Sequence, residues 1–362
     1  MPDNRTLHQL SALETVAPAP MFLSSFFRSP EENFFSSESV TLDIVRDDLS
    51  VAIPLLNIAV GPRHISHDKY KSLEYTPPAY DEDATIHAYA QLQRQPGEDP
   101  FRDPNFLRSA GAQARSILSR MILRVRRSVE LQAAQIFADC AIDLIDLNGT
   151  SIYASNFDAD NVYSAHRADA AAEWAEDGST GDPLGDIEAL AEVVRTDSLR
   201  EPTDLVFGAS ARKRFFTNSR VQEAFDKTRL NLGATAQQQR GGATLLGRLA
   251  IGESTFNLWA YSGKYAHPQT SSLTPYVATN QVLMICGEAR RDLVWGATPN
   301  FTSPNQVEFL NGRLSDSGRQ VDVQIRSWVE PGGRHLHVET QARPLCIPTE
   351  VASFASLDVD PA

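Results

Sequence analysis

The stretch GDPLGDIEALAEVV, residues 181–194, places three carboxylates within seven residues. Asp182, Asp186 and Glu188 are of the residue type that binds divalent cations or serves as an acid and base in hydrolysis. Carboxylates also suit a helix start, because they accept hydrogen bonds from free backbone N–H groups and face the positive end of the helix dipole. We interpret Asp182-Pro183 as a capped turn and Asp186 as the cap of the next helix, and we therefore expect no metal here.

Other groupings of reactive side chains are sparse. Three pairs have a spacing that resembles part of a known site: His64 with His67, His335 with His337, and Ser262 with Lys264. A zinc site needs at least three protein ligands, so each histidine pair is incomplete, and the serine and lysine lack the S-x-x-K spacing. The three cysteines, Cys140, Cys286 and Cys346, form no CxxC pair and are interpreted as buried thiols. We predict no catalytic residue, no metal and no cofactor.

Composition limits the class of protein. The chain has 362 residues, of which 42% are hydrophobic and 22% charged, as in soluble globular proteins of one or two domains. A net charge of −13 argues against a dedicated nucleic-acid-binding protein, which usually carries a basic surface. No apolar run approaches the ~20 residues of a membrane span, and the start lacks the pattern of a secretory signal. We expect the protein to act where it is made, away from membranes.

The clearest element is a helix of about 38 residues, from Pro104 to Ala141, with Asp103 as its cap. Its apolar residues recur at helical spacing: Leu107, Ala110, Ala114, Ile117, Met121, Val125, Val129 and Ile136. Few enzymes need one helix of about 57 Å. A basic face opposite this stripe is formed by Arg120, Arg124 and Arg127. Two interpretations of that face stay open, a solvated surface paired with acids or a weak contact with nucleic acid or an acidic partner.

The first hundred residues contain parts that need a partner surface. A dense aromatic group consists of Phe22, Phe26, Phe27, Phe34 and Phe35. Aromatic rings favour burial, so this arm should dock on its own chain or on a neighbouring one. Residues 50–60 and 84–94 read as two strands separated by about two dozen polar residues. An isolated two-stranded ribbon is marginal in water, which is the first sign of a protein that assembles.

The rest of the chain alternates between strand and helix patterns. Residues 151–156 read as a strand, 204–228 as strand, turn and helix, and 254–285 as further strands. Near the end, RQVDVQIRSWVE and RHLHVETQARPLCI flank PGG and predict a hairpin. The fold class predicted from these elements is α+β.

Several stretches, in order along nearly the whole chain, resemble the capsid protein E family, the major capsid proteins of lambda-type tailed phages. They are MFLSSFFRSPEENFFSSESVTLDIV, the polar loop that ends in DP before the long helix, the W…DP..DIEA pattern from Trp174 to Glu188, LVFGASARKRFFTNSRVQEAF, and AYSGKY. Each stretch alone is weak. Five in the right order are specific.

The resemblance implies the Hong Kong 97-type capsid fold. Its segments would be an N-terminal arm at 1–43, an extended loop at 44–102, a peripheral domain with spine helix and strand at 103–181, an axial domain at 182–304, and a return to the peripheral domain through a long hairpin at 305–362.

The resemblance also implies which residues meet other subunits. The arm would contribute the five phenylalanines listed above. The extended loop would contribute Arg63, Lys69, Lys71, Tyr75 and Tyr80. The basic helix face would lie on the inner surface of a shell. Some relatives join subunits through a Lys–Asn bond, but lambda-type capsids use a decoration protein instead, so we expect no covalent cross-link.

The implied function is that of a major capsid protein, which assembles with itself into hexamers and pentamers of an icosahedral head shell around double-stranded DNA. The procapsid would be built in the bacterial host cytoplasm, and the mature protein would reside in the virion. Implied partners are a portal, a decoration protein, non-specifically contacted DNA and a separate scaffolding protein, because only about 20 irregular residues precede the first aromatic block. The alternatives are an encapsulin-like nanocompartment shell and a metal-dependent hydrolase.

Overall fold

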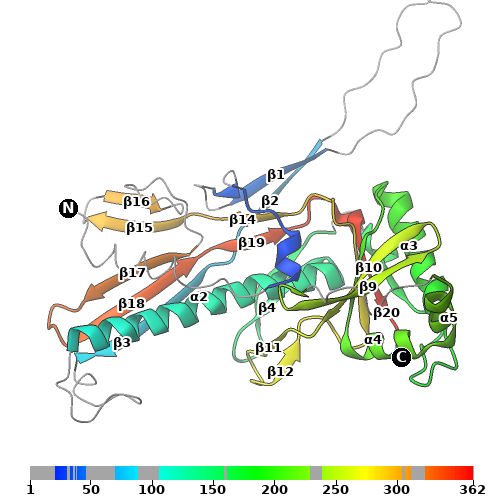
Figure 1. The fold of residues 1–362 in the computed structure, drawn as a ribbon. Helices are drawn as coiled ribbons and strands as arrows, with labels where there is room; N and C mark the ends of the chain where they lie inside the picture. Colours follow the sequence, from blue (N-terminus) through cyan, green and yellow to red (C-terminus); the bar gives the residue numbers. More distant parts are fainter. Residues whose placement is uncertain are drawn as a thin grey trace, which may run out of the picture.

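The computed structural model describes residues 21–30, 33–35, 37, 39–45, 70–88, 106–158, 161–228, 239–303, 306–310 and 323–361. Figure 1 shows an elongated molecule in which one long helix, α2, runs beside extended strands and leads into a lobe of sheet and short helices. The arrangement is α+β, as the sequence predicts.

Helix α2 spans Phe106–Asp139, 34 residues or about 51 Å. The prediction of one long helix is confirmed, with ends two residues inside the predicted bounds. The helix ends because Cys140 takes a left-handed conformation, φ 53°, while its N–H donates the last helical bond to Ile136 O at 2.8 Å. The chain then turns at once into the β4–β5 hairpin, whose strands are Ala141–Ile145 and Ser151–Asn156.

The lobe is built on a seven-stranded sheet in the order β6-β20-β13-β7-β10-β9-β8. In that order the strands span Arg167–Asp169, Phe354–Asp358, Gln281–Ile285, Asp204–Phe207, Ser254–Tyr261, Ala243–Ile251 and Gln239–Arg240. Helices α3 (Pro183–Ser198), α4 (Ala209–Thr217) and α5 (Ser219–Thr228) complete the lobe. The sheet is mixed, because β7 pairs in parallel with β10 and antiparallel with β13.

Alternation along β7 explains why the sheet has two covered faces. Leu205 and Phe207 belong to the core shared with α3 and α4, whereas Val206 belongs to the core shared with α2. Successive strand residues point to opposite faces, so one strand serves both cores. All four residues of β7 are buried.

The elongated part carries a three-stranded sheet against the first half of α2. Its order is β17-β18-β3, with strands Gln324–Val329, His335–Ala342 and Tyr80–His87. A small core of Ile86, Ala114, Leu118 and Val338 joins this sheet to the helix. The predicted C-terminal hairpin is confirmed as β17–β18.

Four further two-stranded pairs complete the described fold. They are β1–β2 (Val40–Val45 with Tyr70–Tyr75), β14–β19 (Asp292–Trp295 with Pro344–Ile347), β15–β16 (Thr298–Ser303 with Gln306–Leu310) and β11–β12 (Lys264–Ala266 with Leu273–Pro275). The described chain also has three short 3-10 turns: η1 (Leu23–Phe26) before β1, η5 (Tyr163–Ala165) between β5 and β6, and η6 (Val351–Ser353) between β19 and β20.

Two sequence expectations about strand partners need correction. The ribbon consists of β1 with β2, whereas β3, which contains the start of the predicted strand 84–94, pairs with β18 because its apolar residues face α2. The other predicted ribbon strand, 50–60, lies outside the described residues. The segment 305–362 does not return wholly to the elongated part, because its last strand, β20, joins the seven-stranded sheet.

The β4–β5 hairpin offers a test of where the core lies, because it carries one buried and one exposed isoleucine. Ile142 is 1% exposed and Ile152 is 73% exposed. We expect Ile142→Ala to lower the free energy of unfolding by about 2–5 kcal/mol, since it leaves a cavity. Ile152→Ala should change it by less than about 0.5 kcal/mol. Urea denaturation followed by tryptophan fluorescence measures the free energy of unfolding of both variants. Equal losses in the two variants would contradict the burial of Ile142.

Candidate assembly interface

Asp182 and Asp186 of the opening stretch contact separate partners, and Glu188 is exposed to solvent. Asp182 is the N-cap of α3 and accepts from Gly185 N at 3.4 Å, while its carboxylate pairs with Arg220. Asp186 lies inside the first turn and accepts from Trp174 Nε1 at 2.8 Å, so the prediction that it caps the helix is wrong. Within the described residues, no group of three or more His, Cys, Asp or Glu side chains is placed to hold a metal.

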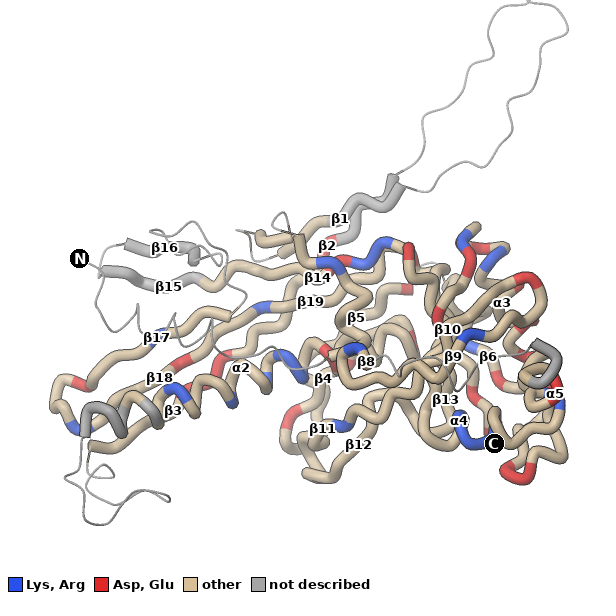
Figure 2. The backbone as a smooth tube through the Cα atoms, viewed as in Figure 1, with Lys and Arg blue, Asp and Glu red and all other residues tan. Residues whose placement is uncertain are grey.

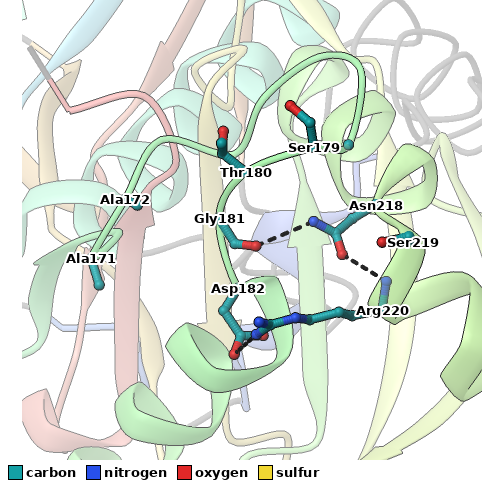
Figure 3. A pocket seen from close by; sticks show the side chains of 10 residues that line it. Ala171, Ala172, Ser179, Thr180, Gly181, Asp182, Asn218, Ser219 and Arg220 are labelled. Carbon is teal, nitrogen blue, oxygen red and sulfur yellow. Dashed lines mark hydrogen bonds and ion pairs between the residues drawn. The ribbon is translucent and has the colours of Figure 1, made fainter.

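Asp182 also lines a cavity of about 300 Å³ between the start of α3 and the turn from α4 to α5 (Figure 3). Asn218 donates to Gly181 O at 3.4 Å and accepts from Arg220 N at 3.0 Å. These bonds hold the turn, and the lining brings together no pair of nucleophile and base. We assign no chemistry to this cavity.

A buried carboxylate on α2 holds the start of the described chain. Glu130 is 0% exposed. It accepts from Phe22 N at 3.1 Å, Leu23 N at 2.8 Å and Ser24 N at 2.8 Å, and from the Tyr261 hydroxyl at 2.7 Å. Backbone N–H groups at the start of a helical turn form an anion site, and here the anion belongs to the protein itself. Burial and the charge of Glu130 raise the pKa of Tyr261, which keeps that hydroxyl a donor.

The contact of Glu130 with the amides of residues 22–24, here called the Glu130 anchor, is supported by close backbone packing nearby. Gly241, with φ 55°, sits in the turn between β8 and β9, and a Cβ there would lie 2.4 Å from Met21 O. Farther on, Arg28 N donates to Arg291 O at 2.8 Å and Leu293 N donates to Arg28 O at 2.7 Å. Residues 21–30 and 33–35, here called the amino-terminal segment, are therefore built into the subunit.

The five predicted arm phenylalanines divide into two groups. Phe22 and Phe27 are 0% and 6% exposed in the core of their own chain, so they are not available to a neighbouring subunit, and for these two the inter-subunit prediction is wrong for the described chain. Phe26, Phe34 and Phe35 are half-buried, and Phe34 stacks on Trp295 with ring centres 6.0 Å apart. A contact of these three with another subunit stays a prediction.

The predicted extended-loop residues are placed only in part. Arg63 and Lys69 lie outside the described residues, and the backbone of Lys71 lies in β2 opposite Ile44. Tyr75, at the end of β2, packs on Phe157 with ring centres 5.0 Å apart. Tyr80, at the start of β3, accepts from Gln132 Nε2 of α2 at 3.0 Å, and burial raises its pKa to about 12. Tyr75 and Tyr80 thus secure both ends of the β2–β3 connection to the body.

The basic face of α2 is exposed at all three predicted positions, Arg120, Arg124 and Arg127. Figure 2 shows blue Lys and Arg positions along α2. Arg124 Nε pairs with Glu82 Oε1 of β3 at 3.2 Å, which agrees with the interpretation of a solvated face paired with acids. Contact of this face with nucleic acid stays a prediction.

The β4–β5 and β11–β12 hairpins both expose large apolar side chains, which the sequence analysis did not single out. Leu147 and Ile152 on β4–β5 are 77% and 73% exposed, and Leu273 on β12 is 72% exposed. Gln269 Nε2 donates to Asn148 O at 3.3 Å and so joins the two hairpins. Sequence pattern missed this group because Leu273 is more than a hundred residues from Leu147 and Ile152.

Comparison with known proteins gives a family and a fold. The family model described as phage major capsid protein E matches residues 6–359. A crystal structure titled as a capsid protein of a prophage of E. coli CFT073 has a TM-score of 0.64 at 14% identity and covers 98% of each chain. No curated protein sequence matches the chain.

Two more distant structures are also similar. The capsid of Ralstonia phage GP4 has a TM-score of 0.49 at 10% identity, over 95% of this chain and 90% of that one. The SrpI encapsulin of Synechococcus elongatus PCC 7942 has a TM-score of 0.44 at 12% identity, over 96% and 89%. We base the fold assignment on the prophage structure. Within the described residues, no helix is long and apolar enough to cross a membrane.

The contacts of Glu130 lead to a testable prediction. Glu130→Gln keeps the size of the side chain but replaces a charged acceptor by an amide, so we expect the free energy of unfolding to fall by about 2–3 kcal/mol. Hydrogen exchange at the amides of residues 22–24 should accelerate as well. Glu253→Gln, at a side chain that is 84% exposed, is the matched control and should change neither quantity. Unchanged exchange in the Glu130 variant would contradict the anchor.

Buried tyrosines make a prediction about alkaline pH. Burial raises the pKa of Tyr80 from 10.0 to about 12 and raises those of Tyr163 and Tyr276 further. A raised pKa means that the unfolded chain loses its protons first, so stability is intact below about pH 10 and falls as pH rises toward 12. We expect a loss of about 1 kcal/mol per buried tyrosine at pH 11.

Urea midpoints at pH 8 and pH 11 measure this loss. Tyr80→Phe should lower stability at pH 8 by about 1 kcal/mol, because the bond with Gln132 is gone, yet show a smaller further drop at pH 11. Equal midpoints at the two pH values in the unmodified protein would contradict the burial of these phenols.

Proposed function

Because this chain belongs to the phage major capsid protein E family and is a protein of the phage head shell, we propose that its copies close into hexamers and pentamers around double-stranded DNA. The proposal includes the sequence-based division into an arm, an extended loop, a peripheral domain with α2 as its spine, and an axial domain. The seven-stranded sheet, with β6 and β20 added, would be the core of the axial domain.

The observation that carries the proposal is the β1–β2 ribbon. Its six residue pairs run from Val40↔Tyr75 to Val45↔Tyr70, with no third strand in the described part of the sheet. Figure 1 shows the ribbon leading away from the body of the molecule. A two-stranded ribbon alone is at best marginal in water. The surface of an adjacent subunit would supply the missing packing.

A structural rather than catalytic role agrees with the satisfied carboxylates of α3. The capping and ion-pair contacts of Asp182 and the indole contact of Asp186 explain these two acids without a reaction. The net charge of −13 would let packaged DNA lie inside the shell without adhering to it, while the basic face of α2 would give weak, non-specific contacts.

The remaining partners follow from the same proposal. A separate scaffolding protein, a portal and a decoration protein would join the shell, which would form as a procapsid in the host cytoplasm. We expect no cofactor and no covalent cross-link between subunits.

The register of the β1–β2 ribbon allows residues 46–69 to be removed without changing the pairing of the two strands. Val45 and Tyr70 pair directly, so an Asn-Gly turn can replace residues 46–69 and close the ribbon as a hairpin. The deletion stops well before β3, which packs on α2. We expect this variant to keep the melting temperature of the intact subunit and to form no closed shells by electron microscopy.

A variant with a Gly/Ser segment of equal length in place of residues 46–69 is the matched control for loop length, and it should also fail to close shells. Closed shells from the Asn-Gly variant would refute the role of the loop. Recovery of a cargo enzyme instead of DNA from native particles would favour the nanocompartment alternative.

A further inference from the structure

The β4–β5 hairpin has one protected edge and one open edge. On the β4 side, the side-chain amide of Gln135 from α2 binds the backbone of Asp143: its Nε2 donates to Asp143 O at 2.7 Å, and its Oε1 accepts from Asp143 N at 3.2 Å. A side chain thus occupies the place where a third strand would pair with β4. Within the described residues, no such cap and no third strand covers the outer edge of β5.

The register of the hairpin shows which backbone groups of β5 face outward. Asp143 lies directly opposite Ala154. In an antiparallel pair, two opposite residues either exchange both backbone hydrogen bonds or direct their groups away from each other. Because the N–H and C=O of Asp143 face Gln135, those of Ala154 point away from β4, toward the open edge. Ala154 is exposed, and among the described residues neither of these groups has a hydrogen-bond partner.

The sequence of β5 lacks the features that keep an edge strand from pairing. Soluble proteins place lysine, other charges or proline on their open edges. Strand β5 reads SIYASN, without a charge or a proline, and its Ile152 is 73% exposed. The one irregularity of the ladder lies at Ile152, at the turn end of the strand, and the pairing from Tyr153 to Asn156 is regular. An edge of this kind can accept an added strand.

Apolar surface is exposed on the same hairpin and on its neighbour. Leu147, in the turn of the β4–β5 hairpin, is 77% exposed, and Leu273 on the β11–β12 hairpin is 72% exposed. The two hairpins touch where Gln269 Nε2 donates to Asn148 O at 3.3 Å. Because this surface is apolar and β5 is uncharged, the strand that fits here is itself apolar and uncharged.

The chain contains a segment of that chemistry. Residues 50–60, SVAIPLLNIAV, have eight aliphatic side chains and no charge. They belong to the stretch 46–69, which lies outside the described residues and connects Val45 to Tyr70, the last pair of the β1–β2 ribbon. Running out and back, this stretch can reach up to about 40 Å beyond the ribbon at about 3.3 Å per residue. Figure 1 shows the ribbon leading away from the body, which favours contact with another copy over contact with the same chain.

We propose that residues 50–60 of one copy pair as an added β-strand with the outer edge of β5 in a second copy, beside the exposed side chains of Leu147, Ile152 and Leu273. This inference rests on the proposed function, and it names the surface that the extended loop meets. Backbone hydrogen bonds give such a contact its affinity, and apolar side chains give it specificity. Pro54 has no N–H to donate, so the added strand forms the new edge of a three-stranded sheet.

Cross-linking tests the contact between two chains that can each play only one part. The acceptor has residues 46–69 replaced by Asn-Gly and carries Ala154→Cys. The donor keeps its loop, carries Asn57→Cys, and has Ala154→Pro, which removes an outward N–H from its own β5 without breaking the ladder to β4. The three native cysteines are buried and should not react. A bismaleimide then links the two introduced thiols, including thiols that are offset by a residue along the strand.

We expect the mixture to give a cross-linked heterodimer of acceptor and donor. Its yield should exceed at least about tenfold that of a matched acceptor with Ala172→Cys, at an exposed alanine of the lobe, because a bound pair holds its thiols at high effective concentration. Equal yields from the two acceptors would overturn the pairing. A single chain with both Asn57→Cys and Ala154→Cys that cross-links only within itself would overturn it as well, since the loop would then lie on its own β5.

Shell formation gives an independent readout. We expect a chain with Ala154→Pro to keep the melting temperature of the unmodified subunit and to form no closed shells, and Ala154→Lys, which keeps the N–H but adds a charge at the edge, to lower their yield. Leu199→Lys, at a leucine of the lobe that is 56% exposed, is the matched control and should leave the yield unchanged. Normal shells from both Ala154 variants would contradict the pairing and leave the proposed function intact, whereas a heterodimer from chains that never form shells would contradict only the proposed function.

Discussion

The fold depends on a buried carboxylate in the last third of α2, at Glu130. Glu130 receives three backbone N–H groups from the amino-terminal segment and the hydroxyl of Tyr261 from β10, so one carboxylate joins the chain start, the long helix and the sheet of the lobe. Burial of a carboxylate without hydrogen-bond donors would lower the free energy of unfolding by several kcal/mol. The burial of Glu130 on α2 therefore requires the amino-terminal segment, and the segment in turn is held by Glu130. The aromatic rings of Phe22 and Trp259, 5.0 Å apart, close this site from water.

Some regions of the subunit bury their apolar surface within the same chain, and others leave strands or apolar side chains uncovered. The start of the amino-terminal segment and both cores around the seven-stranded sheet are packed within one chain. The β1–β2 ribbon has only its own two strands, and Leu147, Ile152 and Leu273 are exposed on the hairpins beside α2. Membership of a phage capsid family gives these features one explanation, since a shell subunit must leave some surfaces to be covered by copies of itself.

Sequence pattern predicted the elements whose cause is local. The helical stripe located α2 within two residues, and the PGG turn located the β17–β18 hairpin. Features that depend on distant partners were missed or misplaced. The sequence leaves open whether Phe22 docks on its own chain or on a neighbouring one, and only the distant Glu130, which accepts from the Phe22 amide, places it in its own subunit. Asp186 looks like a cap until Trp174 Nε1 donates to its carboxylate. The pairing of β3 with β18 likewise has no local signal, because the two strands lie far apart in the sequence.

The central claim is that the subunit completes its β1–β2 ribbon only on a neighbouring copy. Hydrogen exchange of β1 and β2, compared between the isolated chain and assembled particles, tests this directly, because protection reports local opening. The account predicts that amides of β1 and β2 exchange fast in the isolated chain and become protected in the particle, whereas amides of residues 22–24 are slow in both. Slow exchange of β1 and β2 in the isolated chain would contradict it.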